Sequence, residues 1–186
     1  MFQIRKAGLP VQPTSIVKIK AVADSFRSHI EKWCGPYGTF CPIVNALETL
    51  GKEPFEDLGF AVLEDNDPNM ADKWAYTDPT GKCIYLSETV YQKACQNNPQ
   101  ARFTIAHELG HLLLGHKVDV IFARQNCDTK IPCYRDSEWQ ADTFAAQLLM
   151  PTELAQGKTT NELEQLFGVS ASAAIARGDR LKKHEI

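Results

Sequence analysis

The chain has 186 residues, of which 44% are hydrophobic and 23% are charged, enough apolar residues for the core of an ordinary globular domain. Its formal net charge of −3 argues against binding along a nucleic-acid backbone, because such binding requires a basic face. The N-terminal residues include no apolar signal segment, and apolar stretches such as 58–63 are too short to cross a bilayer. These properties predict a cytoplasmic protein that contacts neither membranes nor nucleic acids directly.

Six cysteines are present, and no two of them have the C-x-x-C spacing of a zinc ribbon or a thioredoxin-type redox motif. They are Cys34, Cys41, Cys83, Cys95, Cys127 and Cys133. In a reducing compartment we expect free thiols. The last two flank one polar loop, where they could instead pair with each other or bind a second metal ion.

In the N-terminal half, we expect an extended lead-in over 1–14 and an amphipathic helix over 15–33, where apolar residues recur at helical spacing. A short helix over 42–50 is expected to end at Gly51. Three strands are expected next, at 58–64, 73–77 and 82–86. The sequence Asp78-Pro-Thr-Gly81 between the last two strands is typical of a tight hairpin turn.

In the C-terminal half, helical patterns are expected over 90–97, 101–115, 137–150 and 160–181, the last of them broken at 168–170. Ser137 is predicted to cap its helix, and Pro151 lies beyond the end of that helix. The polar stretch 117–135 is long enough to be a functional loop or lid. A helix, three strands and then further helices together predict an α+β fold.

The most informative motif is His107-Glu108-Leu109-Gly110-His111, within the apolar helix predicted over 101–115. Histidines four residues apart lie on one face of a helix, so both imidazoles can reach one tetrahedral Zn²⁺. Zinc lowers the pKa of a bound water toward neutrality, and Glu108 beside that face could accept the proton. Burial of these polar groups is unfavourable unless a metal ion compensates them. We therefore predict one zinc ion per chain, with Glu108 as general base.

Two residues could supply a third ligand, His116 and Glu138. His116 does not fit the H-E-x-x-H-x-x-G-x-x-H pattern, because Leu114 and Lys117 occupy the positions of its glycine and its last histidine. Glu138 and Asp142 are four residues apart and thus share one face of the following helix. We predict that Glu138 completes the zinc site and that Asp142 accepts a hydrogen bond from a ligating histidine.

The two motifs together resemble those of the ImmA/IrrE family of metallopeptidases. The likeness consists of His-Glu-Leu-Gly-His-Leu-Leu-Leu-Gly-His over 107–116 and Glu-x-x-Ala-Asp-x-Phe-Ala-Ala-x-Leu-Leu-Met-Pro over 138–151, and it extends from about residue 54 to Ser170. It implies a zincin-like, thermolysin-type fold with a small three-stranded sheet, an active-site helix carrying H-E-x-x-H, and C-terminal helices. With it we expect an N-terminal extension over 1–53, a peptidase core over 54–151 and a packed helical tail over 152–186.

The resemblance also implies a chemistry and a substrate. His107, His111 and Glu138 would be zinc ligands, and Glu108 would be the general base of peptide hydrolysis. Members of the family typically cleave a helix-turn-helix transcriptional repressor, which relieves repression of stress-response genes or mobile elements. That substrate comes from the resemblance alone.

Two other classes of function have weaker support in the sequence. A DNA-binding regulator is suggested by 161–170, which resembles half of a helix-turn-helix, but 152–186 contains five Lys/Arg and five Asp/Glu and is therefore neutral. A non-catalytic zinc sensor or interaction protein would need no general base, so Glu108 argues against it.

The sequence leaves two parts of the peptidase site open. Tyr76, Tyr85 and Tyr134 are all candidates for stabilising an oxyanion, and the sequence does not choose between them. The sheet edge near 74–77 could bind an extended peptide by strand addition.

Overall fold

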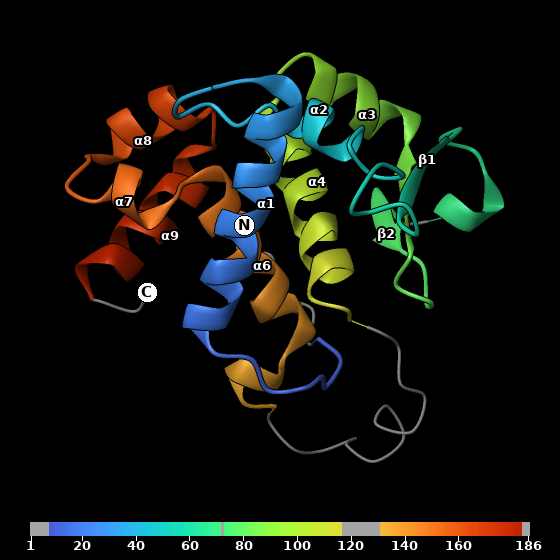
Figure 1. The fold of residues 1–186 in the computed structure, drawn as a ribbon, viewed down its shortest axis with the longest axis horizontal. Coiled ribbons are helices and arrows are strands. Elements are labelled where there is room, and N and C mark those ends of the chain that lie inside the picture. The colour runs from blue at the N-terminus through green and yellow to red at the C-terminus, as the bar shows by residue number, and fades with distance from the viewer. Residues whose placement is uncertain (1–7, 72, 117–130, 184–186) are drawn as a thin grey trace.

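The computed structural model describes residues 8–71, 73–116 and 131–183. The expectations for Cys127 and for most of the loop 117–135 lie outside these residues. The predicted α+β class is confirmed, because a small sheet is followed and flanked by helices (Figure 1).

The sheet of the described chain has three strands, as predicted: β1 (Gly59–Leu63), β2 (Ala75–Thr77) and β3 (Cys83–Ser87). Their order is β1-β3-β2, with β1 parallel and β2 antiparallel to β3. The predicted turn between β2 and β3 is present: Asp78 Oδ1 accepts hydrogen bonds from the backbone N–H groups of Lys82 and Cys83 at 2.8 and 2.9 Å. β2 thus lies at one edge of this sheet, among the residues that the structure describes.

Helix α1 (Ile16–Cys34) confirms the first predicted helix, and α2 (Ile43–Leu47) is a shorter form of the second. Ser15 caps α1 by accepting a hydrogen bond from the backbone N–H of Lys18. The apolar face of α1 is fully buried, through Ile19, Ala23, Phe26 and Ile30, and α1 packs against α6 (Ser137–Leu149). This helix therefore covers one side of the segment that carries Glu138.

Helices α3 (Glu88–Cys95) and α4 (Pro99–Leu113) confirm the next two predictions. The prediction that Ser137 caps the following helix is wrong. Asp136 is the cap, because its Oδ1 accepts hydrogen bonds from the N–H groups of Glu138 and Trp139 at 2.9 and 3.3 Å. The hydroxyl of Ser137 instead accepts a hydrogen bond from Leu9, 128 residues earlier, a long-range contact that local spacing does not indicate.

The C-terminal part forms α7 (Thr152–Ala155), α8 (Thr160–Phe167) and α9 (Ala171–Lys182). The predicted break is confirmed at Gly168, whose φ of +61° is in the left-handed region that ends helices. The guanidinium of Arg102 on α4, only 1% exposed, donates to the carbonyls of Phe167 and Gly168 at 3.2 Å. Buried residues of α1, α4, α6, α8 and α9 belong to one core cluster. The division at residues 53 and 151 stays a prediction.

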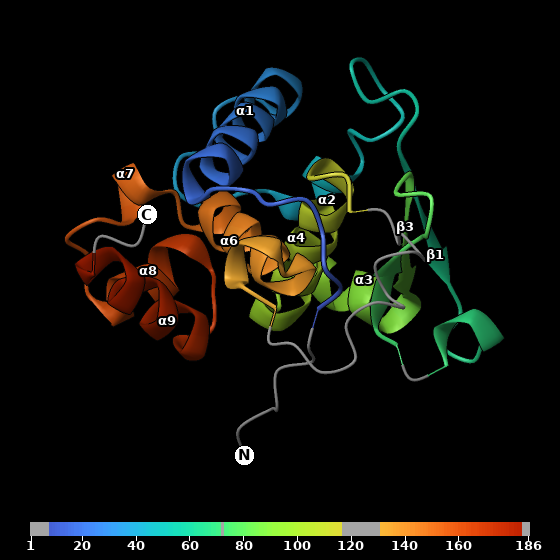
Figure 2. The ribbon, with the colours of Figure 1, turned by 90° about the horizontal axis from the view of Figure 1, so that it is seen from below.

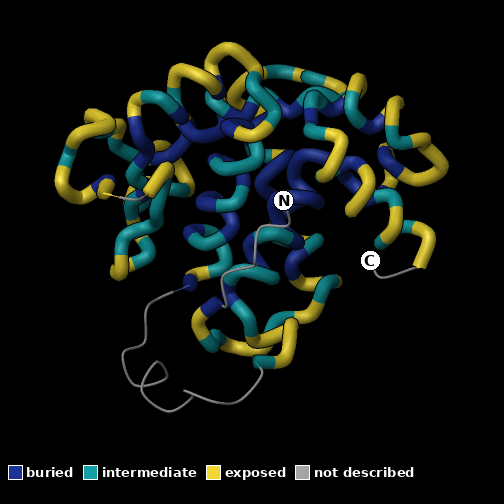
Figure 3. The backbone as a smooth tube through the Cα atoms, turned by 180° about the vertical axis from the view of Figure 1, so that it is seen from behind, coloured by how far each residue is buried: buried dark blue, intermediate teal, exposed yellow. Residues whose placement is uncertain are grey.

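Helices α4 and α6 lie side by side at the centre of the molecule, with the sheet on one side and α7–α9 on the other (Figures 1 and 2). Buried residues are concentrated along these central helices (Figure 3). Their close approach depends on Gly110, because a Cβ atom there would lie 3.0 Å from Ala141 Cα and 3.1 Å from Ala141 O. Glycine in α4 thus allows the backbones that carry the candidate ligands to meet.

A substitution of Gly110 tests this contact. Alanine favours a helix by about 1 kcal/mol, but a clash with the rigid backbone of α6 costs about 1–3 kcal/mol, so Gly110→Ala is expected to lower the free energy of unfolding by roughly 1 kcal/mol. Gly178→Ala is the matched control, since Gly178 lies in α9, where an added Cβ would have no neighbouring atom within 4 Å.

The control is expected to raise the free energy of unfolding by up to about 1 kcal/mol. Urea denaturation of both variants measures the two effects. Equal stabilisation by the two alanines would show that α4 and α6 do not require a glycine at their contact.

Candidate metal centre

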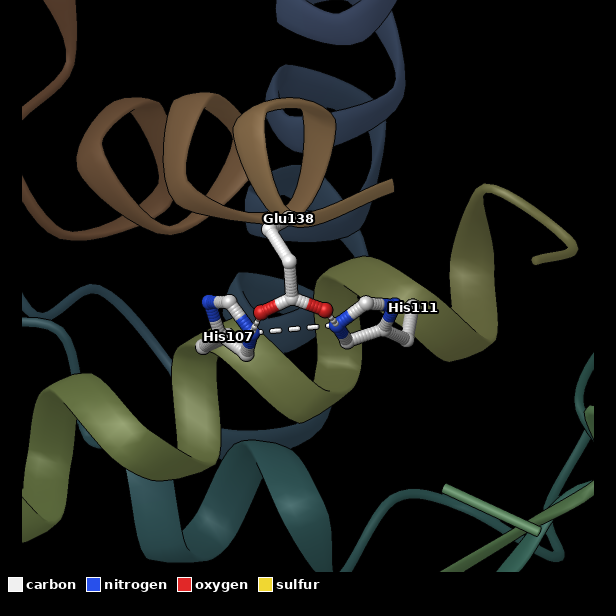
Figure 4. Close-up of side chains that lie close together, drawn as sticks. All are labelled: His107, His111 and Glu138. Atoms are coloured by element: carbon white, nitrogen blue, oxygen red, sulfur yellow. Dashed lines mark hydrogen bonds and ion pairs between the residues drawn. The ribbon is translucent and has the colours of Figure 1, made fainter. Parts of the chain in front are cut away.

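His107 and His111 project from successive turns of α4, and Glu138 points from the first turn of α6 toward the space between them (Figure 4). Glu138 Oε2 lies 3.4 Å from His107 Nε2, and Glu138 Oε1 lies 3.4 Å from His111 Nε2. The two Nε2 atoms are 3.0 Å apart. One donor atom from each residue can be chosen so that all lie within 4.8 Å of one another, so these three side chains could hold a metal ion.

The hydrogen bonds behind His107 determine which of its nitrogens faces this group. His107 Nδ1 lies 2.9 Å from Asp142 Oδ1. A carboxylate only accepts hydrogen bonds, so Nδ1 carries the proton and, in a neutral ring, Nε2 presents its lone pair toward Glu138. The structure therefore brings Asp142 to the position predicted for it, one turn after Glu138 on α6.

A longer chain of hydrogen bonds determines which nitrogen of His111 carries the proton. The amide nitrogen of Gln140 donates to the backbone carbonyls of Gln12 and Tyr134 at 3.0 and 2.8 Å, so its Oε1 is the atom that faces His116 Nε2 at 2.9 Å. His116 therefore carries its proton on Nε2 and accepts at Nδ1, which lies 2.9 Å from His111 Nδ1. His111 then donates from Nδ1 and presents the lone pair of Nε2.

The donor atoms of His107, His111 and Glu138 fit a metal ion for the following reason. A metal ion is bound by neutral imidazoles, and two nitrogen lone pairs and a carboxylate in one small space repel one another unless a proton or a metal ion lies between them. His116, the other candidate for the third ligand, lies behind His111 and is not a member of the three-residue group. Two histidines and a carboxylate are a common donor set for zinc sites that keep one position open.

The pKa values of these groups agree with a site that attracts positive charge. Burial alone would lower the pKa of His107, but hydrogen bonds to Asp142 and Glu138 outweigh it and raise that pKa to about 10, so without a metal ion a proton occupies Nε2, the place that a metal ion would take. The His107 imidazole, and after it that of His111, holds the pKa of Glu138 well below its usual range, against the effect of burial. Glu138 is therefore an anion at neutral pH. Burial lowers the pKa of His116 to about 4, so His116 is neutral there.

Glu108 is only 8% exposed and lies next to the metal-ligand face of α4. Thr77, the last residue of β2, donates a hydrogen bond from Oγ1 to Glu108 Oε2 at 2.8 Å. The edge strand thus orients the carboxylate.

Sequence reasoning missed two residues of this site, Thr77 and Gln140. Gln140 lies between Glu138 and Asp142, the two residues of this helix that were predicted for the site, so its position beside them was an available signal. For Thr77 the sequence offered no signal, because its hydrogen-bond partner Glu108 is 31 residues away.

The three tyrosines considered for the oxyanion are placed differently. Tyr76 and Tyr85 stack on each other across β2 and β3, with ring centroids 5.0 Å apart. Tyr134 is 50% exposed, and its backbone carbonyl accepts the hydrogen bond from Gln140. None of the five cysteines that the structure describes forms a disulfide, which agrees with the free thiols expected for them.

Comparison with known families identifies the class of protein. The family described as the IrrE N-terminal-like domain, an M78 peptidase family, matches residues 55–178. The match covers most of the chain, so the protein belongs to the ImmA/IrrE family, as the motifs predicted. Its fold is the zincin-like fold expected from that resemblance, and membership supports a metal-dependent peptidase in general terms.

Among solved structures, the chain is similar to a Mycobacterium tuberculosis transcriptional regulator, with a TM-score of 0.50 and 16% sequence identity. The similarity covers 88% of this chain and 52% of the regulator, so this chain spans about half of that protein's length. At this identity the likeness concerns the fold alone. No curated protein matches the sequence. Within the described residues, no helix combines the length and the apolar character needed to cross a membrane.

The hydrogen-bond chain behind His111 can be tested by removing the amide of Gln140. Gln140→Met keeps the shape of the side chain but no longer fixes the proton of His116, so zinc affinity is expected to fall by about 10–100-fold. Competition with a fluorescent zinc chelator measures the affinity, and ¹⁵N chemical shifts of the imidazoles report the tautomers of His111 and His116.

Gln147→Met is the matched control. Gln147 is a buried amide on the same helix, but it bonds to Asp24 and Thr152 and not to the histidines. The Gln147→Met variant is expected to be less stable, while its zinc affinity and the tautomers of His111 and His116 stay unchanged. Equal zinc affinities for the two variants would contradict a role of Gln140 in orienting His111.

Proposed function

We propose that the protein is a zinc-dependent endopeptidase that hydrolyses a peptide bond of a protein substrate. The observation that carries this proposal is the convergence of two imidazole lone pairs and the Glu138 carboxylate beside a second, buried carboxylate, Glu108. Membership in an M78 peptidase family supports the same activity.

In the proposed mechanism, His107, His111 and Glu138 would hold the metal ion, and Asp142 and His116 keep the two imidazoles in the tautomers that would face it. A zinc ion held there would supply Lewis acidity, which acidifies water and polarises the carbonyl of the peptide bond. Glu108 accepts the proton of the attacking water and donates it to the leaving amine. Its burial and its place beside the ligand face of α4 suit it to this work rather than to holding the metal.

Thr77 is proposed to position Glu108. Its hydroxyl lies 2.8 Å from Glu108 Oε2 and 3.2 Å from the backbone carbonyl of Glu108, so it can donate to the carboxylate and hold it in one orientation. Because Thr77 is also the end of edge strand β2, the strand that could pair with an extended substrate is tied directly to the general base.

For the substrate class we propose a helix-turn-helix transcriptional repressor, on the strength of family membership. The cleaved repressor would have to present an extended segment, since backbone pairing with β2 and access to the metal both require one. The two alternative functions make different predictions: a zinc sensor does not depend on Glu108, and a DNA-binding regulator does not depend on zinc.

The general base is tested by Glu108→Gln. Glutamine keeps the size of the side chain but cannot accept the proton, so cleavage is expected to fall by roughly 10²–10⁴-fold. Elemental analysis is expected to show about one zinc per chain in both proteins, because the three ligands are intact. His111→Ala is the contrasting variant and is expected to lose zinc and activity together. Normal cleavage by Glu108→Gln would remove Glu108 from the mechanism.

The same Glu108→Gln protein tests the substrate. Loaded with zinc, it is expected to retain an uncleaved helix-turn-helix repressor encoded beside its gene, while the unaltered protein cuts that repressor at one site. Pull-down followed by mass spectrometry identifies the retained protein. Retention of unrelated proteins alone would contradict the repressor assignment and leave the peptidase assignment standing.

The positioning role of Thr77 is tested by Thr77→Val, which keeps the branched shape but removes the donor. We expect kcat to fall by about tenfold, the lower end of the effect of such a partner, with KM and zinc content unchanged. Thr77→Ser retains a hydroxyl and is expected to restore most of the activity. A serine variant as impaired as the valine variant would attribute the effect to packing.

A further inference from the structure

A cavity of about 650 Å³ lies directly beside the candidate metal centre. Its lining includes Asp142, whose carboxylate contacts His107, and Thr104, which precedes His107 by three residues on α4. The cavity is large enough for a ligand, since binding sites of small molecules and peptide segments typically measure about 300–1,000 Å³.

The cavity continues the two helix faces that carry the metal ligands. On α4, residues three, four and seven before His107 line it, namely Thr104, Phe103 and Gln100. On α6 and just beyond its end, Ala146 and Met150 line it, four and eight residues after Asp142. Residues at these spacings lie on one face of a helix. The same two helix faces therefore carry both the candidate metal ligands and part of the lining of this cavity.

The far wall comes from α9. Ala173, Ala176, Arg177 and Arg180 line the cavity at helical spacing, and two of these four are small. On the opposite side stand Lys93 and the indole of Trp74, which is 64% exposed and has the Lys93 ammonium 5.8 Å from its ring centroid. Helix α9 of the C-terminal tail thus forms part of the wall of this cavity.

The charge of the lining selects among ligands. Three basic side chains, those of Lys93, Arg177 and Arg180, face one acidic side chain, that of Asp142, in a chain whose net charge is −3. Asp142 is bound to His107, and the guanidinium of Arg177 donates to Met150 O and Gln147 Oε1. Arg180 Nη1 donates to Thr143 Oγ1 at 3.3 Å, and Lys93 and Arg180 lie at two sides of the cavity with cationic groups suited to a carboxylate.

We infer that this cavity binds the substrate segment adjacent to the scissile bond, and that it selects a large apolar side chain next to an aspartate or glutamate. The apolar side chain fits between α4, α6 and α9, where Phe103, Ala146 and Met150 surround it, and the acidic neighbour is drawn to Lys93 or Arg180. This inference rests on the proposed peptidase function, because it uses the metal centre to orient the peptide.

Binding can be measured without cleavage on the zinc-loaded Glu108→Gln protein. The probes are short fluorescein-labelled peptides that contain Leu-Glu, Leu-Lys or Ser-Glu in one otherwise identical context, and the readout is fluorescence anisotropy. The Leu-Glu peptide is expected to bind at least about tenfold more tightly than either of the others, the scale of discrimination by an apolar pocket. The preference for glutamate over lysine is expected to weaken as salt is added.

Two variants in this background locate the binding. Ala176→Trp fills the cavity from α9 and is expected to abolish the preference for leucine over serine. Arg180→Glu is expected to reverse the preference for glutamate over lysine. Ile175→Trp and Lys158→Glu are the matched controls, since Ile175 is 51% exposed on the other face of α9, Lys158 is exposed before α8, and neither lines the cavity. Both controls are expected to bind as the parent protein does.

Cleavage of the same peptides by the zinc-loaded protein with Glu108 intact separates the two proposals. Peptides that bind with the expected preference but are never cut would refute the peptidase and leave the cavity assignment in place. Peptides that are cut, with binding unaffected by Ala176→Trp and Arg180→Glu, would overturn the cavity assignment and leave the peptidase in place. Failure of all the peptides to bind would also overturn the cavity assignment.

Discussion

The close approach of α4 and α6 is the constraint on which the rest of the structure depends. Gly110 contributes no side chain, so the backbone of α4 meets Ala141 of α6, and three candidate ligands from two helices face one small space. The packing around α4 and α6 also holds these two helices in place. Helix α1 buries its apolar face on α6, and the Arg102 guanidinium attaches α4 to the end of α8. Displacement of either helix would separate the histidines from Glu138.

Polar groups behind the ligands add a second level of order. Each candidate ligand histidine has its outer nitrogen engaged, His107 by Asp142 and His111 by His116. Behind His116, the orientation of Gln140 is set by backbone carbonyls of the N-terminal segment and of the residues before α6. Segments far from the motif in sequence thus determine the tautomer of a histidine within it. This explains how a buried polar cluster can be both stable and prepared for a cation.

The arrangement also connects the sheet and the tail to the same site from opposite sides. Thr77 brings the edge strand to Glu108, and α9 closes the cavity beside Asp142. A peptide substrate would then meet backbone donors and acceptors along β2 and a basic, partly apolar cavity near the other helices. The tail of this protein is neutral as a whole, but its cavity-facing side presents Arg177 and Arg180, so its local chemistry differs from its composition.

The sequence by itself determined the elements and the motif-bearing residues. Helical periodicity predicted α1, α4 and α6, the hairpin turn predicted β2 and β3, and four-residue spacings predicted that His107 and His111, and likewise Glu138 and Asp142, share a face. These features depend on residues within one or two turns of each other, which local spacing encodes. Only the tertiary structure decided that Asp136 rather than Ser137 caps α6, that His116 supports His111, that Thr77 and Gln140 belong to the site, and that α9 forms a cavity wall. Each of these depends on contacts between segments distant in the chain, which arise from the crossing of α4 and α6 and from the packing around it.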